Sequence, residues 1–175
     1  DHLARMLADI PPEIIRVVVE SMQAAGLGER ETGSTTLVMA LFHGQRVLLA
    51  HVGDSRIYRL RYNRLQLLTR DDSLLRDQVE LGLIDVEDAG GSHNRNLVTR
   101  ALGIAAHVSP HLRDDEALAG DVYLLCSDGL NDLVDDSDIE LIMNSLKSNL
   151  PLATHHLVQA AKDNGGHDNV SAILV

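Results

Sequence analysis

The chain has 175 residues and a formal net charge of −11, because 26 acidic residues outnumber 15 lysines and arginines. This length fits one domain, and a hydrophobic content of 45% is that of an ordinary globular protein. The excess of negative charge argues against binding through the phosphates of a nucleic acid. It does not argue against phosphate chemistry, because bound divalent cations reverse the sign of the charge locally.

Cys126 is the only cysteine, so the chain cannot form an internal disulfide. The sequence shows no signal-peptide pattern and no apolar run near the roughly 18 residues that would span a membrane. We therefore expect a cytoplasmic protein that does not engage a membrane.

The first predicted element is an amphipathic helix over residues 11–25. Ile14, Ile15, Val18 and Met22 recur at helical spacing, and Gly26 marks the exit. Its many β-branched residues have modest helix propensity, so burial against the rest of the fold must stabilise it.

From residue 34 the pattern becomes that of consecutive antiparallel strands separated by turn residues. The expected turns are His43-Gly44 and Tyr62-Asn63. Residues 47–50 are apolar on both faces, which indicates a sheet covered on each side. The strands predicted here are residues 35–42, 46–52, 55–60 and 65–69.

The next stretch, residues 71–95, is polar and charged, and we interpret it as an irregular flap with a short helix over residues 73–81. Two further helices are predicted, one over residues 138–146 behind a Ser137 or Asp136 cap, and one from Pro151 to about Asn164. The later strands are predicted over residues 97–100, 107–111, 121–126 and 170–175. Since helices and strands are segregated rather than alternating, the fold class is expected to be α+β with antiparallel sheets in a single domain, 1–175.

The strongest local signal for chemistry is an apolar strand that ends in Ser127-Asp128-Gly129. A carboxylate at the end of a buried strand is well placed to bind a hard cation, and a glycine after it leaves room for the ion. Read alone, this tripeptide is more often a plain turn.

A second acid, Asp168, lies in the segment Gly165-Gly166-His167-Asp168-Asn169, just before the last predicted strand. Alone, this segment too is more often a turn than a site. Two aspartates at strand ends can converge, however. Oxygen ligands without Cys or His at zinc spacing favour Mg²⁺ or Mn²⁺.

The segment Gly53-Asp54-Ser55-Arg56 does not fit the elbow of a serine hydrolase, because no glycine stands two residues after the serine. We expect a structural role for it, in which Asp54 and Ser55 bond the local backbone and Arg56 pairs with an acid. Cys126, inside an apolar strand, is interpreted as a core residue rather than a nucleophile.

Taken in order, the segments of this chain resemble the type 2C, or PPM, family of metal-dependent protein serine/threonine phosphatases in its compact bacterial form. The resemblance covers nearly the whole chain. The segments that carry it are GSTT at 33–36, AHVGDSRIY at 50–58, LTRDDS at 68–73, NLVTRALG at 96–103, LCSDGL at 125–130 and GGHDNVS at 165–171.

The resemblance implies a sandwich of two antiparallel β-sheets flanked by helices, here lacking the N-terminal strands of the family. Asp128 and Asp168 correspond to two ligands of a dinuclear Mn²⁺ or Mg²⁺ centre. Asp71 and Asp132 correspond to acids that hold a third, weaker ion in the complete enzyme.

The implied chemistry is hydrolysis of phosphoserine or phosphothreonine in a protein by a metal-activated water, which needs no catalytic side chain beyond the metal ligands. The partner would be a phosphorylated protein, either a Ser/Thr kinase or its target. The residues that bind the substrate are not identified.

The chain departs from the family pattern at its start. The family's early acid, its phosphate-binding arginine and its Asp-Gly-Met-Gly-Gly-His-like segment have no counterpart in the sequence. We therefore expect the chain to begin downstream of half of its active site, and to be inactive by itself.

Three functions remain open. The first is an active phosphatase of which this chain is an incomplete part. The second is an inactive phosphatase-like binding module that recognises a phosphoprotein or a kinase. The third is a general Mg²⁺-dependent hydrolase of small phosphoesters, which the ordered series of motifs disfavours.

Overall fold

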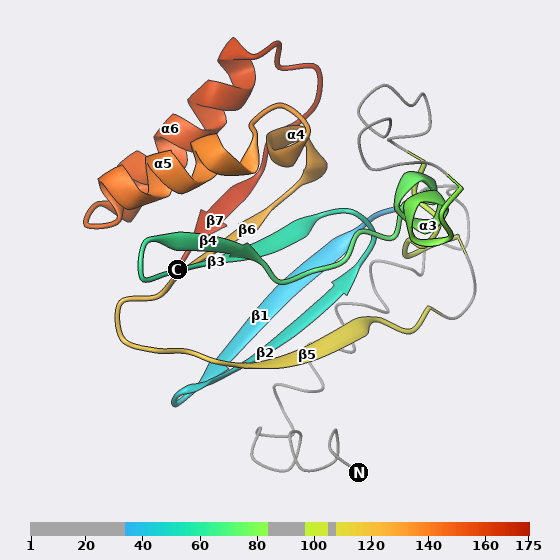
Figure 1. Ribbon diagram of the computed structural model, residues 1–175, viewed down its shortest axis with the longest axis horizontal. Coiled ribbons are helices and arrows are strands. Elements are labelled where there is room, and N and C mark those ends of the chain that lie inside the picture. The colour runs from blue at the N-terminus through green and yellow to red at the C-terminus, as the bar shows by residue number, and fades with distance from the viewer. Residues whose placement is uncertain (1–33, 84–96, 105–107) are drawn as a thin grey trace. The chain divides into compact units, whose positions relative to one another are not determined.

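The computed structural model describes residues 34–83, 97–104 and 108–175 (Figure 1). The helix predicted over residues 11–25 and the later part of the predicted flap lie outside these ranges. The contacts divide the chain into two compact units. Unit 1 is Asp1–Gly53 with Asp72–Ala117, and unit 2 is Asp54–Asp71 with Leu118–Val175. The expectation of a single domain stays a prediction.

Unit 1 contains an antiparallel sheet in the order β1-β2-β5. The hairpin of β1 and β2 closes through Gly44 and Gln45, one residue later than predicted, because His43 still pairs with Arg46. Helix α3 follows Ser73, whose side chain accepts a hydrogen bond from the backbone N–H of Arg76. The bounds are β1 Leu37–His43, β2 Arg46–Val52, β5 His111–Glu116 and α3 Leu74–Glu80.

Unit 2 contains a second antiparallel sheet in the order β4-β3-β6-β7. The β3–β4 hairpin turns at Tyr62 and Asn63, as predicted, and both have the positive φ angles that such a tight turn requires. The strands are β3 Arg56–Arg61, β4 Arg64–Leu67, β6 Val122–Cys126 and β7 Ala172–Leu174. The helices are α4 Asp128–Asn131, α5 Asp136–Leu146 and α6 Leu150–Asp163.

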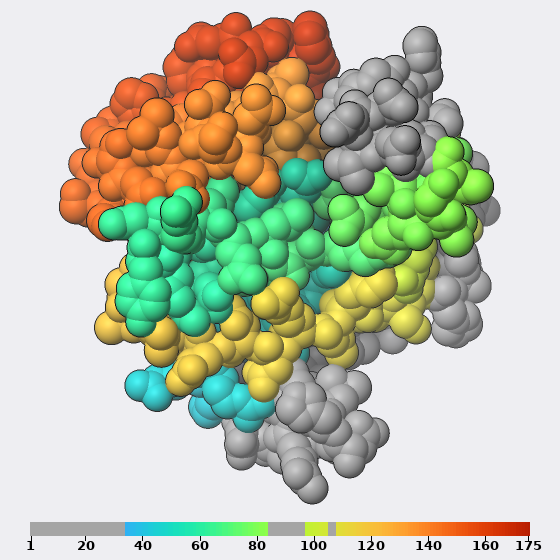
Figure 2. Space-filling model, in the orientation of Figure 1, coloured from blue at the N-terminus to red at the C-terminus, as the bar shows by residue number. Residues whose placement is uncertain are grey.

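The core of unit 2 forms between its sheet and its helices. Fully buried side chains meet there from β3, β6 and all three helices, and they are mostly aliphatic because aromatic residues make up only 2% of the chain. Outside the core, α5 and α6 form one continuous surface in the space-filling view (Figure 2). None of the helices in the described ranges is long and apolar enough to cross a membrane.

Two antiparallel sheets with helices confirm the predicted α+β class. Strands β2 and β3 follow one another along the chain but belong to different sheets. The chain leaves β2 at Gly53, where φ is +100° and a Cβ atom would lie 2.4 Å from Cγ2 of Thr36. Only glycine fits this change of direction.

Most predicted elements differ from the observed ones by one or more residues at their ends, and β7 in particular is Ala172–Leu174 rather than residues 170–175. Residues 97–100 form no strand, and Val98 makes only an isolated bridge with Ser73. The strand expected over residues 107–111 instead begins at His111, since Pro110 has no N–H to donate to a ladder. Helix α5 begins after Asp135 rather than after either predicted cap.

We expect Leu157→Ala to lower the free energy of unfolding of unit 2 by about 2–5 kcal/mol, because this fully buried side chain of α6 would leave a cavity. Leu141→Ala is the matched control, since Leu141 of α5 is 64% exposed and should cost less than about 0.5 kcal/mol. Urea unfolding measures both. Equal losses in the two variants would contradict this assignment of the core.

Candidate metal centre

Strand direction places four aspartates at one end of the unit 2 sheet. The pairing of β3 with β6 sets Arg56 opposite Cys126, so the start of β3 lies beside the end of β6. The pairing of β6 with β7 sets Ala172 opposite Cys126 as well, and β4 ends opposite the first half of β3. The acids that flank these strand ends are Asp54 before β3, Asp71 after β4, Asp128 after β6 and Asp168 before β7.

The charges that act on Asp54 come from three of the neighbouring acids, Asp128, Asp71 and Asp132. Burial, together with the negative charges of these acids, raises the pKa of Asp54 to about 6, against the lowering effect of its own backbone N–H. Asp54 is only 9% exposed. The sequence interpretation gave it a role in the turn alone, although it satisfies the same strand-end criterion that selected Asp128.

Asp128 is the first residue of α4, and its Oδ1 accepts a hydrogen bond of 2.9 Å from the backbone N–H of Gly129. A Cβ atom on Gly129 would lie 2.4 Å from the backbone oxygen of Asn169. The glycine therefore lets the turn after β6 approach the segment that carries Asp168.

Ser127 joins these two segments through its backbone and its side chain. Its backbone N–H donates to the oxygen of Ser171 at 3.1 Å. Its Oγ donates to the oxygen of Asn169 at 3.1 Å and accepts from the N–H of Ser171 at 3.0 Å. Asp168, whose Oδ1 accepts from the N–H of Asn169 at 2.6 Å, is thereby held in the loop beside Asp128.

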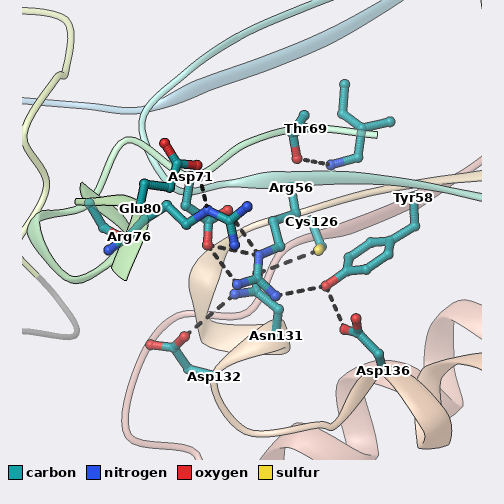
Figure 3. Close-up of polar contacts among 12 residues, drawn as sticks. Arg56, Tyr58, Thr69, Asp71, Arg76, Glu80, Cys126, Asn131, Asp132 and Asp136 are labelled. Carbon is teal, nitrogen blue, oxygen red and sulfur yellow. Dashed lines mark hydrogen bonds and ion pairs between the residues drawn. The ribbon is translucent and has the colours of Figure 1, made fainter. Parts of the chain in front are cut away.

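Asp71 is held by Arg56, as Figure 3 shows. The Nε atom of Arg56 donates to both carboxylate oxygens, at 3.0 and 3.1 Å, and Nη2 donates to Oδ2 at 2.6 Å. The predicted pairing of Arg56 with an acid is confirmed. Asp132, at the C-terminal end of α4, lies one turn after Asp128 and donates its backbone N–H to the oxygen of that residue at 2.9 Å.

Arg56 is fixed in turn by a buried tyrosine. Its Nη1 donates to the hydroxyl of Tyr58 at 3.0 Å, and that hydroxyl donates to Oδ1 of Asp136 at 2.9 Å (Figure 3). Burial raises the pKa of Tyr58 above its ordinary value, so the phenol stays protonated and remains a donor.

Cys126 is 2% exposed, and burial raises the pKa of its thiol to about 12. The side chain is therefore not a thiolate at neutral pH, and it cannot act as an activated nucleophile. The interpretation of Cys126 as a core residue is confirmed.

The chemistry of these donors fits Mg²⁺ or Mn²⁺, which prefer carboxylate oxygens. Asp128 and Asp168 each use Oδ1 for one backbone N–H, and neither Oδ2 has a hydrogen-bond partner within the described residues. In the same part of the chain, no group of three or more His, Cys, Asp or Glu side chains is arranged to hold an ion. The acids in the described ranges can therefore supply some of the ligands of an ion, but they do not form a complete ligand shell.

The chain resembles known bacterial phosphatases in sequence, although no family model matches it. It is 43% identical over 141 residues to the serine/threonine protein phosphatase PstP of Mycobacterium tuberculosis, which covers 80% of this chain but only 27% of that protein. It is 34% identical over 173 residues to the serine/threonine phosphatase stp of Listeria monocytogenes, which covers 99% of this chain and 66% of that protein.

Solved structures agree with these similarities. A crystal structure of PstP from M. tuberculosis matches with a TM-score of 0.80 at 38% identity, over 87% of this chain and 64% of that chain. Another structure of the PstP catalytic domain holds two manganese ions. The PPM Ser-Thr phosphatase MsPP of Mycobacterium smegmatis matches with a TM-score of 0.79 at 31% identity, over 98% of this chain and 77% of that chain. In sequence and in fold, the chain belongs to the PPM family of metal-dependent bacterial serine/threonine protein phosphatases.

Proposed function

We propose that this chain is part of an enzyme that removes phosphate from phosphoserine and phosphothreonine in proteins and so opposes a Ser/Thr kinase. The observation that carries the proposal is the convergence of strand-end aspartates at one end of the unit 2 sheet, in a chain of the PPM family. The substrate would be a phosphorylated kinase or its target.

In this proposal Asp128 and Asp168 bind the catalytic Mg²⁺ or Mn²⁺, and Asp71 and Asp132 contribute to a further, weaker ion. Bound ions lower the pKa of a water and neutralise charge on the phosphoryl group. The bound ions would also be needed before a phosphorylated substrate could approach this acidic site. Asp54 and its acidic neighbours would repel a phosphate dianion if no cation were bound.

The side chains next to Asp128 support a water nucleophile. The hydroxyl of Ser127 is engaged both as donor and as acceptor in the junction with residues 169 and 171. Cys126 is a buried, protonated thiol. Neither side chain is placed or activated to attack a phosphate ester.

A second candidate function is an inactive phosphatase-like module that binds a phosphoprotein or a kinase. It is favoured by one observation, that the described residues contain no group of three or more metal-ligating side chains.

For the full-length gene product, we predict that Asp128→Asn and Asp168→Asn each lower Mn²⁺-dependent phosphate release from a phosphothreonine peptide by more than about 100-fold, because each removes a charged ion ligand. Phosphate release is measured at saturating Mn²⁺. Asp138→Asn is the matched control, since Asp138 is an exposed acid in the first turn of α5 and should leave the rate unchanged.

Full activity in either ligand variant would remove that residue from the metal centre. If the unmutated protein binds phosphopeptide but releases no phosphate at any Mn²⁺ concentration, the binding-module function replaces the phosphatase function.

The 175-residue chain by itself is predicted to release phosphate at less than about 1% of the rate of the full-length gene product, because the described acids do not make a closed ligand shell. The same peptide assay, run on both proteins at equal concentration, measures this ratio. Comparable rates would show that these 175 residues supply every ligand the reaction needs.

A further inference from the structure

We propose that Arg56 competes with the divalent cation for the carboxylate of Asp71, and so sets the affinity of the ion that Asp71 binds. The inference rests on the proposed function, because it takes Asp71 to be an ion ligand. It gives a role to Arg56, which is not one of the aspartates at the strand ends and is not a proposed ion ligand.

The contact between these two residues engages both oxygens of the carboxylate, which are the atoms that would bind a cation. Arg56 reaches both oxygens of Asp71, with distances of 2.6 to 3.1 Å. The pair is only partly exposed, with 23% of the arginine side chain and 16% of the aspartate side chain accessible. A two-oxygen contact of this kind is the strongest that a carboxylate makes with a side chain, and little water screens it here.

The guanidinium is held in place from its other side. Nη1 of Arg56 donates to Tyr58, which is fully buried and is itself bonded to Asp136. Arg56 also begins β3, directly opposite Cys126. The arginine is therefore part of the rigid sheet, whereas Asp71 lies beyond the end of β4.

The charges make Asp71 different from Asp128 and Asp168. Its negative charge is already compensated by Arg56. Asp128 and Asp168 have no ion pair with a Lys or Arg in the described ranges, and their contacts are with backbone N–H groups. A cation that binds Asp71 must displace a guanidinium or lie beside it, and both cost affinity.

Exchange between the two partners is feasible because Arg56 keeps a bond when Asp71 leaves. Its Nη1 still donates to Tyr58, and Asp136 still accepts from that tyrosine. The guanidinium is thus not left as an isolated buried charge. Asp71 passes from Arg56 to the ion only when the ion concentration is high enough to compete.

The test is Mn²⁺ binding to the full-length gene product, measured by calorimetry. Arg56→Gln should tighten the weakest resolved Mn²⁺ site by about fivefold or more, because it removes the competing charge. Adding Asp71→Asn to that variant should abolish the gain. Arg46→Gln is the matched control, since it breaks another partly exposed Arg–Asp pair, with Asp114 at 2.9 Å, and should leave Mn²⁺ affinity unchanged.

A measurement on the unmutated protein covers the case in which Arg56→Gln does not fold. The Nε–H proton of Arg56 donates to Asp71, so its NMR signal should shift and exchange faster with water as Mg²⁺ is added. An unchanged Arg56 signal at saturating Mg²⁺ would overturn the inference.

The binding data separate this inference from the proposed function. If Asp128→Asn abolishes Mn²⁺ binding but Arg56→Gln leaves it equal or weaker, the metal centre stands and the competition by Arg56 is wrong. If Asp128→Asn leaves Mn²⁺ binding unchanged, the proposed metal centre is wrong, and the inference fails with it.

Discussion

The candidate centre depends on one constraint, the antiparallel pairing of β6 with strands on both sides. Cys126, the last residue of β6, lies opposite Arg56 at the start of β3 and opposite Ala172 at the start of β7. Because neighbouring strands run in opposite directions, loops far apart in the sequence meet at this one end of the sheet. The bonds of Ser127 and the missing side chain of Gly129 then bring the segments of Asp128 and Asp168 into contact.

Several buried or half-buried carboxylates in one place are costly unless cations compensate them. Arg56 supplies one positive charge, and it pairs with Asp71. The pKa of Asp54 is raised to about 6 because this carboxylate is buried and lies near the negative charges of other acids. This imbalance explains how a chain of net charge −11 can belong to a family that acts on phosphate esters, because the ions rather than the side chains would meet the substrate.

Patterns within short segments of the sequence predicted those features that depend on neighbouring residues in the chain. An acid after an apolar strand identified Asp128, and an arginine in a tight turn was expected to pair with an acid. That its partner is Asp71 follows from strand register, which no single segment contains. Asp54 was not predicted to belong to the acidic cluster at the sheet end, because a role in the turn before β3 already accounted for an aspartate at this position. The change of sheet at Gly53 and the charged strand β5 were also missed, since tertiary pairing overrides their local composition.

The central claim is that the end of the unit 2 sheet binds divalent ions through Asp128 and Asp168. Its most direct test is anomalous diffraction from crystals of the full-length gene product grown with Mn²⁺. The account predicts anomalous density in direct contact with carboxylate oxygens of Asp128 and Asp168. Ordered carboxylates at both positions with no peak beside them, or a peak bound only by other residues, would contradict it.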